Sequence, residues 1–161
     1  MDSEKIARLQ QTPVFGGLSA NAVDLLLTDA CLVEVPAGEC YMREGELGDK
    51  VYVLERGRVE VLKAVADGQE TLKELGPGDC FGEMALLDIS PRSATVRALE
   101  DCVALEIPAG ALYQLYEHDI EQFSLLTLNM GREVSRRLRA TERMLWPGIS
   151  REREGGDSGL R

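Results

Sequence analysis

The spacing of apolar residues changes period twice along the chain. At the start, residues 4–11 place apolar side chains three apart, which predicts a short amphipathic helix. Ser19 can cap a second helix, on which Val23, Leu26 and Leu27 share one face. The chain therefore opens with a helical segment.

Beyond residue 30 the pattern alternates with period two and is interrupted by glycines. The stretch KVYVLERGRVEVLKA predicts two strands joined at Arg56-Gly57. DGQETLKEL predicts a hairpin turn at Asp67-Gly68 and a further strand, and SATVRALE and CVALEIP predict two more. Turn signals about every 8–12 residues are typical of a β-sandwich or barrel.

After Pro108 the helical period returns. AGALYQLYEHD predicts a short helix, and IEQFSLLTLNMGREVSRRLRATERML predicts a long one with an apolar stripe along one face. The residues of this stripe include Met130, Val134, Leu138 and Leu145.

The pattern predicts one α+β domain in the order helices, β-roll, helices. We expect helices in residues 1–30, the roll in 31–108, further helices in 109–146 and a disordered tail in 147–161, where apolar periodicity is lost. A length of 161 residues suits a single domain with a substantial core.

Charge and composition narrow the function. A net charge of −10 opposes general attraction to nucleic acid or to an anionic membrane. No apolar run approaches the roughly 18–20 residues that span a bilayer, and the charged start MDSEKIARLQQ is not a signal peptide. We therefore expect a cytoplasmic protein with no membrane partner. With four widely spaced cysteines and one histidine, His118, we also expect no metal site, no cofactor and no catalytic residues.

The stretch FGEMALLDISPRSATV, residues 81–96, combines groups of opposite chemistry. Gly82 lets a ligand approach the backbone, and the helix formers after it predict a short helix, starting there, whose first N–H groups can bind an anion. Arg92 offers a planar fork that matches phosphate oxygens, and Ser93 adds a hydroxyl. Glu83 only accepts hydrogen bonds, which suits the hydroxyls of a ribose. These residues fit a sugar phosphate, but they equally allow Arg92 and Glu83 to pair across a tight loop.

The same segment resembles the phosphate-binding cassette of cyclic nucleotide-binding domains, F-G-E-[LIM]-A-L followed by P-R-x-A-T-[VI]. Upstream, AGECYMREGELGDKVYVLERGRVEVL resembles the first strands of that family. The resemblance covers about residues 8–146 and implies an antiparallel β jelly roll (a double-stranded β-helix) with N-terminal helices and a long C-terminal helix. The cassette matches are Phe81, Gly82, Glu83, Met84, Ala85, Leu86, Pro91, Arg92, Ala94, Thr95 and Val96.

The resemblance implies a role for each cassette residue. Glu83 would accept a hydrogen bond from the ribose 2′-hydroxyl beside the backbone of Gly82, and Arg92 would hold the exocyclic oxygens of the cyclic phosphate. Ser93 and nearby backbone N–H groups would complete the phosphate cradle. The implied site comprises Gly82, Glu83, Met84, Ala85, Arg92, Ser93 and Ala94.

Base recognition is less firmly implied. Val61 and Leu72 match positions that wall the base, although ordinary roll core explains them equally well. Thr141 falls where the catabolite-activator branch of the family places a hydroxyl that contacts adenine. Its neighbour Glu142 stands where that branch has a small hydroxyl residue. Ser93 leaves the preference open too, so the expected ligand is cAMP with cGMP as the alternative.

The stretch GREVSRRLRATERML resembles the dimer helix of the same branch. We therefore expect a homodimer with the apolar stripe as its seam; the alternative is that the stripe packs only on its own roll. Unlike that branch, the chain shows no helix-turn-helix after Pro147-Gly148, so we expect a stand-alone domain. The arginines of the helix are interleaved with Glu133 and Glu142, which favours a solvated face and no direct DNA binding. They are Arg132, Arg136, Arg137, Arg139 and Arg143.

Three functions compete. The first is a cyclic-nucleotide sensor that passes binding through the long helix to a downstream protein or a dimer interface. The second is a ligand-free dimerisation or docking scaffold with the same fold. The third, a metal-dependent roll enzyme, is remote because such sites need several histidines.

Overall fold

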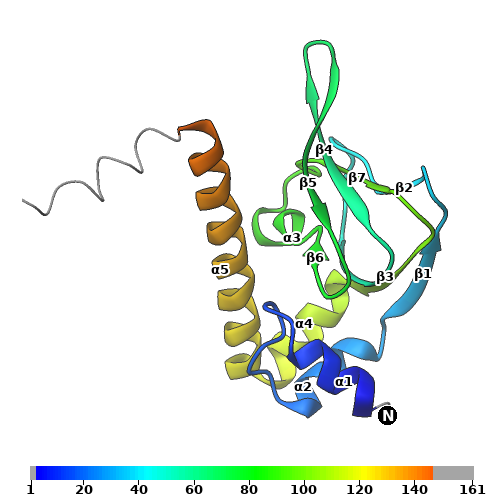
Figure 1. Cartoon of the computed structure of the whole chain (residues 1–161). Helices are drawn as coiled ribbons and strands as arrows, with labels where there is room; N and C mark the ends of the chain where they lie inside the picture. Colours follow the sequence, from blue (N-terminus) through cyan, green and yellow to red (C-terminus); the bar gives the residue numbers. More distant parts are fainter. Residues whose placement is uncertain (1–2, 147–161) are drawn as a thin grey trace, which may run out of the picture.

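A computed structural model describes residues 3–146, except for the side chain of Ala85, and shows two four-stranded antiparallel sheets beside a group of helices (Figure 1). The sheet orders are β1-β8-β3-β6 and β2-β7-β4-β5. The predicted antiparallel jelly roll is therefore confirmed. The strands are β1 (Cys31–Val35), β2 (Cys40–Met42), β3 (Lys50–Arg56), β4 (Val59–Val65), β5 (Gly68–Leu75), β6 (Cys80–Phe81), β7 (Thr95–Ala98) and β8 (Cys102–Pro108).

Of the five helices in residues 3–146, four occupy the stretches that the apolar period predicts. Ser19 caps α2, accepting a hydrogen bond from the Ala22 amide at 3.1 Å. α3 differs from expectation: it starts at Met84 rather than at Gly82, because Gly82 adopts φ 86° and turns the chain first. The helices are α1 (Ser3–Gln10), α2 (Ala20–Leu27), α3 (Met84–Asp88), α4 (Ala109–His118) and α5 (Ile120–Leu145).

Strand β3 is buried on both faces, which links two cores. Tyr52 and Leu54 face the space between the sheets, where they pack with residues of β4 and β7. Val51 and Val53 face the helices and join the core formed with α1, α2, α4 and α5. This two-sided burial explains why β3 is apolar at consecutive positions.

Helix α5 rises beside the roll, with α3 between them (Figure 1). Its N-terminal half is anchored in the helical core, since Met130 is 2% exposed and Asn129 donates to the carbonyls of Val14 and Gly16 at 3.0 and 2.8 Å. Among residues 3–146 no helix is long and apolar enough to cross a membrane.

The predicted dimer seam is therefore wrong in part. Met130 lies in the core of its own domain and Val134 is half-buried, so neither forms an open seam. Leu138 and Leu145 are exposed, at 59% and 63%. The predicted alternative, packing on the same chain, holds for the N-terminal half of the stripe. Residues 147–161, predicted to be a tail, lie outside the described part of the chain.

Candidate functional site

The cassette, residues 81–96, joins β6 to β7 and contains α3 (Figure 1). α3 spans only five residues, and Glu83 at its N-cap makes no side-chain cap. Few peptide dipoles are aligned in one turn, so α3 offers less attraction to an anion than the sequence led us to expect. The positive charge of the site must come mainly from a side chain.

Arg92 supplies that charge from a buried position. It is 5% exposed, and its guanidinium donates to the carbonyls of Gly82 at 2.9 Å and Lys50 at 3.0 Å. The guanidinium carbon lies 6.0 Å from the centre of the Tyr52 ring. Within residues 3–146 no carboxylate forms an ion pair with Arg92. A buried cation without a counter-ion is costly, so this arrangement is suited to receive an anion.

Two glycines make room for this guanidinium. A Cβ at Gly48 would lie 2.0 Å from Arg92 Nε, and one at Gly82 would lie 2.7 Å from Nη1. The backbone holds the arginine from the other side, because the Arg92 amide donates to the Glu46 carbonyl at 2.8 Å. The loop before β3 and the cassette thus clamp one side chain between them.

Glu83 is the buried acid of the site, with 1% exposure. It does not pair with Arg92, so that predicted alternative is wrong. Its Oε1 instead accepts a hydrogen bond from Arg137 of α5, and Arg137 also donates to the Cys80 carbonyl. Burial raises the pKa of the Glu83 carboxyl above its ordinary value, and the charge of Arg137 opposes that rise.

Further charges surround this pair. The Oε1 atom of Glu133 lies 3.6 Å from Nε of Arg137, and Glu133 is half-buried on α5. Desolvation, and then the charge of Arg137, lower the pKa of Lys73 on β5, while Glu83 and Glu133 act in the opposite sense. Glu83 is therefore the centre of a charge network that joins the cassette, β5 and α5.

Arg137 is the functional residue that the sequence interpretation missed. The interleaved acids predict that Arg137 is solvated, yet its side chain is only 23% exposed. The available signal was its position seven residues after the buried Met130, which places both on the same side of α5. The other arginines of the helix are exposed, as predicted; they are Arg132, Arg136, Arg139 and Arg143.

The remaining cassette residues lie at the other end of the loop. Ser93 Oγ lies 3.5 Å from the sulfur of Met84, so the hydroxyl has no strong hydrogen-bond partner among residues 3–146. Lys63 donates to the Ser93 carbonyl at 2.7 Å and to Glu44 at 2.5 Å, which ties the cassette to β4. Ala94 is buried. The backbone N–H groups near Ser93, which are predicted to donate to a phosphate, therefore lie on a segment that Lys63 holds against β4.

The predicted base-contacting residues fall into different environments. Val61 is 9% exposed and belongs to the core between the sheets, whereas Leu72 is 47% exposed on β5. Thr141 follows Arg137 by one helical turn, and its hydroxyl donates to the Arg137 carbonyl at 3.1 Å. Glu142 follows Arg137 by five residues and so points about 140° away around the helix. Of these two residues, Thr141 lies on the side of α5 that meets the cassette and Glu142 does not.

The geometry brings a cation and an acceptor to the two ends of one short loop without pairing them. Arg92 can donate its remaining N–H groups to an anion, and Glu83 can accept from hydroxyls. Among residues 3–146 no cluster of three His, Cys, Asp or Glu side chains is arranged to hold a metal ion. The arrangement suits a small ligand that carries both a phosphate and a sugar hydroxyl.

Comparison with known proteins shows to which protein family the chain belongs. The model of the cyclic nucleotide-binding domain family matches residues 32–119, which include the cassette. The chain belongs to this family. The Thermus thermophilus cyclic AMP receptor protein is 35% identical over 135 residues, which cover 83% of this chain and 61% of that protein. This cyclic nucleotide-binding domain therefore spans about three fifths of that relative.

Similar solved structures support the same family assignment. A cyclic nucleotide-binding domain from Methylobacillus flagellatus superposes with a TM-score of 0.79 at 25% identity, covering 90% of this chain and 82% of that one. The regulatory domain of Toxoplasma gondii PKA, solved with cAMP, gives a TM-score of 0.66 at 27% identity, covering 71% of this chain and 45% of that one. The fold of this chain is thus similar to that of a PKA regulatory domain and of another cyclic nucleotide-binding domain.

Proposed function

We propose that this domain is a cyclic-nucleotide sensor whose ligand is cAMP and which passes binding to α5 without catalysing a reaction. The observation that supports it most strongly is the buried Arg92 guanidinium, which hydrogen-bonds to two carbonyls and pairs with no carboxylate among residues 3–146. A cyclic phosphate offers the missing negative charge. A bound phosphate would offset the cost of burying this cation.

Glu83 supplies the second half of the recognition. Its carboxylate is the acceptor for the ribose 2′-hydroxyl, and it is already held in place by Arg137. A ligand hydroxyl that approaches Glu83 must share or displace the Arg137 contact. Ligand binding and the position of α5 are therefore coupled through one carboxylate.

The coupling between ligand binding and the position of α5 would carry the signal to other proteins. Ligand can shift α5 only to the extent that it binds one position of the helix more tightly than another. The shifted helix then presents a changed surface to a downstream protein or to a second copy of the chain. The proposed location is the cytoplasm, because a net charge of −10 opposes binding to an anionic membrane.

A ligand-free scaffold is the second candidate, and one observation favours it. Glu83 already has a partner in Arg137, so the carboxylate does not need a ligand for its hydrogen bonds. Arg92 favours the sensor, because in a scaffold its buried guanidinium would have two carbonyl acceptors but no counter-ion.

Thermal unfolding with excess cAMP, cGMP or 5′-AMP separates the candidates. A ligand at 100 times its Kd adds about 2.7 kcal/mol to the free energy of unfolding. The sensor predicts a rise in Tm with cAMP and a smaller rise with cGMP, with 5′-AMP as the open-phosphate control. No rise in Tm with either cyclic nucleotide would contradict the sensor and favour the scaffold.

A further inference from the structure

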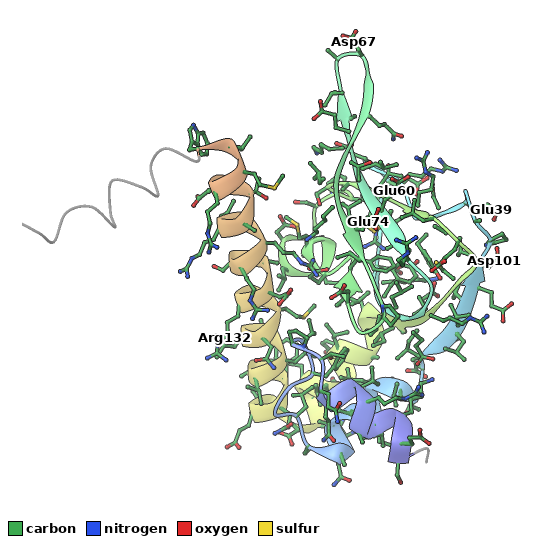
Figure 2. All side chains as sticks on the ribbon, viewed as in Figure 1. Glu39, Glu60, Asp67, Glu74, Asp101 and Arg132 are labelled. Carbon is green, nitrogen blue, oxygen red and sulfur yellow. The ribbon has the colours of Figure 1, made fainter. Side chains whose placement is uncertain are left out.

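Strand β5 places one lysine, Lys73, on the inner face of the roll. Leu75, the last residue of the strand, is 7% exposed and belongs to the core between the sheets. Its neighbour Glu74 lies opposite Glu60 of β4 on the outer face (Figure 2), where it pairs with Arg58 at 3.3 Å. Side chains alternate along a strand, so Lys73 points inward as Leu75 does.

The register of β4 and β5 gives the same direction for Lys73. It lies opposite Val61, which belongs to the core between the sheets, and cross-strand neighbours share one face of a sheet. The register then shifts by one residue, so that the partner of Leu62 is Thr71 and Leu72 is the extra residue. A bulge re-aims the side chains beside it. Here it leaves Leu72 47% exposed next to the inward-pointing lysine.

The ammonium group of Lys73 lies at the Glu83 end of the cassette. The residue is half-buried, and the nearby charges that act on it include those of Arg137, Glu83 and Glu133. Desolvation, and then the charge of Arg137, lower its pKa. Among residues 3–146 Lys73 forms no hydrogen bond and no ion pair. The three N–H donors of its ammonium group are therefore available to an acceptor on a ligand.

A cyclic nucleotide with its phosphate at Arg92 and its ribose at Glu83 places its base near this lysine. The base is attached to the ribose carbon next to the one that bears the 2′-hydroxyl, whereas the cyclic phosphate joins the opposite side of the ring. The hydroxyl of Thr141 already donates to a carbonyl of its own helix at 3.1 Å, and Glu142 points away from the cassette. Of these three side chains, Lys73 is the one that offers unused donors to the base.

We infer that Lys73 contacts the base and gives this sensor a second ligand, cGMP. The inference rests on the proposed function, because Arg92 and Glu83 must hold the cyclic phosphate and the ribose. An ammonium group only donates hydrogen bonds, and the O6 and N7 atoms of guanine both accept them. Adenine sets its N7 acceptor beside an N6 amino group, which is itself a donor. Lys73 therefore favours guanine over adenine and narrows the preference for cAMP.

Calorimetric titration of the full chain with cGMP and with cAMP tests the inference. Lys73→Met keeps the aliphatic stem and removes the donors. Affinity for cGMP should fall at least about fivefold, while affinity for cAMP should change by less than about twofold. Lys5→Met is the matched control, because it removes the same charge from α1, where Lys5 lies 3.8 Å from Glu55, and should leave both affinities unchanged. Equal losses for the two nucleotides, or no loss for either, would overturn the inference.

Cyclic IMP shows which atoms of guanine are recognised. It keeps O6 and N7 but lacks the exocyclic amine, a donor that suits an acceptor such as the Ser93 hydroxyl. Lys73→Met should weaken cyclic IMP by the same factor as cGMP. A loss confined to cGMP would assign the preference to the amine and contradict the lysine contact. Binding of cAMP keeps the two proposals apart: if wild type binds cAMP and Lys73→Met leaves cGMP unchanged, only the role of Lys73 falls. No binding of either nucleotide by wild type would overturn the proposed function as well.

Discussion

Arg137 of helix α5 forms an ion pair with Glu83 of the cassette, at the point where the helix meets the roll. Glu83 is 1% exposed, so it relies on this partner for the compensation of its charge. The pair places the acceptor proposed for the ribose and the element proposed to move in direct contact.

Removing Arg137 should destabilise the fold and do so in a pH-dependent way. Arg137→Ala leaves a buried carboxylate without its partner, which costs about 1–3 kcal/mol at neutral pH. The loss should shrink as the pH falls, because protonation of Glu83 removes the buried charge that Arg137 compensates. Urea unfolding at neutral and at lower pH measures both effects. Arg136→Ala, an exposed arginine one residue earlier, is the control. Equal losses for the two variants would contradict the ion pair.

Glu83 should also leave its mark on the pH dependence of wild-type stability. Its folded pKa is raised, mainly by burial, so the folded chain binds a proton more tightly than the unfolded chain. Its contribution to stability is therefore fully present below the unfolded pKa and is lost as the pH rises through the folded pKa. Glu83→Gln should flatten this part of the stability profile. An unchanged slope in that variant would show that another group titrates there.

Gly48 should be as necessary for ligand binding as the arginine it accommodates. A Cβ there would lie 2.0 Å from Arg92 Nε, so Gly48→Ala must push the guanidinium out of place. We expect affinity for cAMP to fall at least about tenfold, since one charge-assisted contact contributes about 1.5–3 kcal/mol. Gly76→Ala is the matched control, because a Cβ there meets nothing within 4 Å. Similar affinities for both variants would contradict the clamp around Arg92.

Val61 and Leu72 should separate a core role from a ligand role. Val61 is buried between the sheets, so Val61→Ala should lower the free energy of unfolding by about 0.5–3 kcal/mol. Leu72 is 47% exposed, and Leu72→Ala should stay within about 0.5 kcal/mol of wild type. Weaker cAMP binding by Leu72→Ala, measured by calorimetry, would identify it as a wall of the base pocket. Unchanged affinity would leave it an ordinary surface residue.

Much of the fold could be predicted because apolar periodicity depends on local neighbours. The bounds of α5 and β8 and the Ser19 cap follow from spacing and from one hydroxyl. The start of α3 could not be predicted in this way. The helix formers after Gly82 predict a helix that starts at this glycine, but Gly82 turns the chain with a positive φ and the helix starts at Met84.

The chemistry of the site was harder to predict for a reason of distance. Glu83 and Arg137 are 54 positions apart, and only the folded chain shows that they pair. The same holds for Gly48 beside Arg92. Helix periodicity identified an apolar stripe on α5, but it could not say which side meets the roll. Met130 was therefore assigned to the wrong partner.

Calorimetric titration with cAMP tests most directly whether the buried guanidinium of Arg92 binds the phosphate of the ligand. Wild type should bind with measurable heat, and Arg92→Leu should bind at least about tenfold more weakly. Arg58→Leu, at an exposed arginine on the roll, should bind like wild type. Thermal unfolding of each variant confirms that the fold is intact. Equal affinity of Arg92→Leu and wild type for cAMP, in a folded protein, would contradict the account.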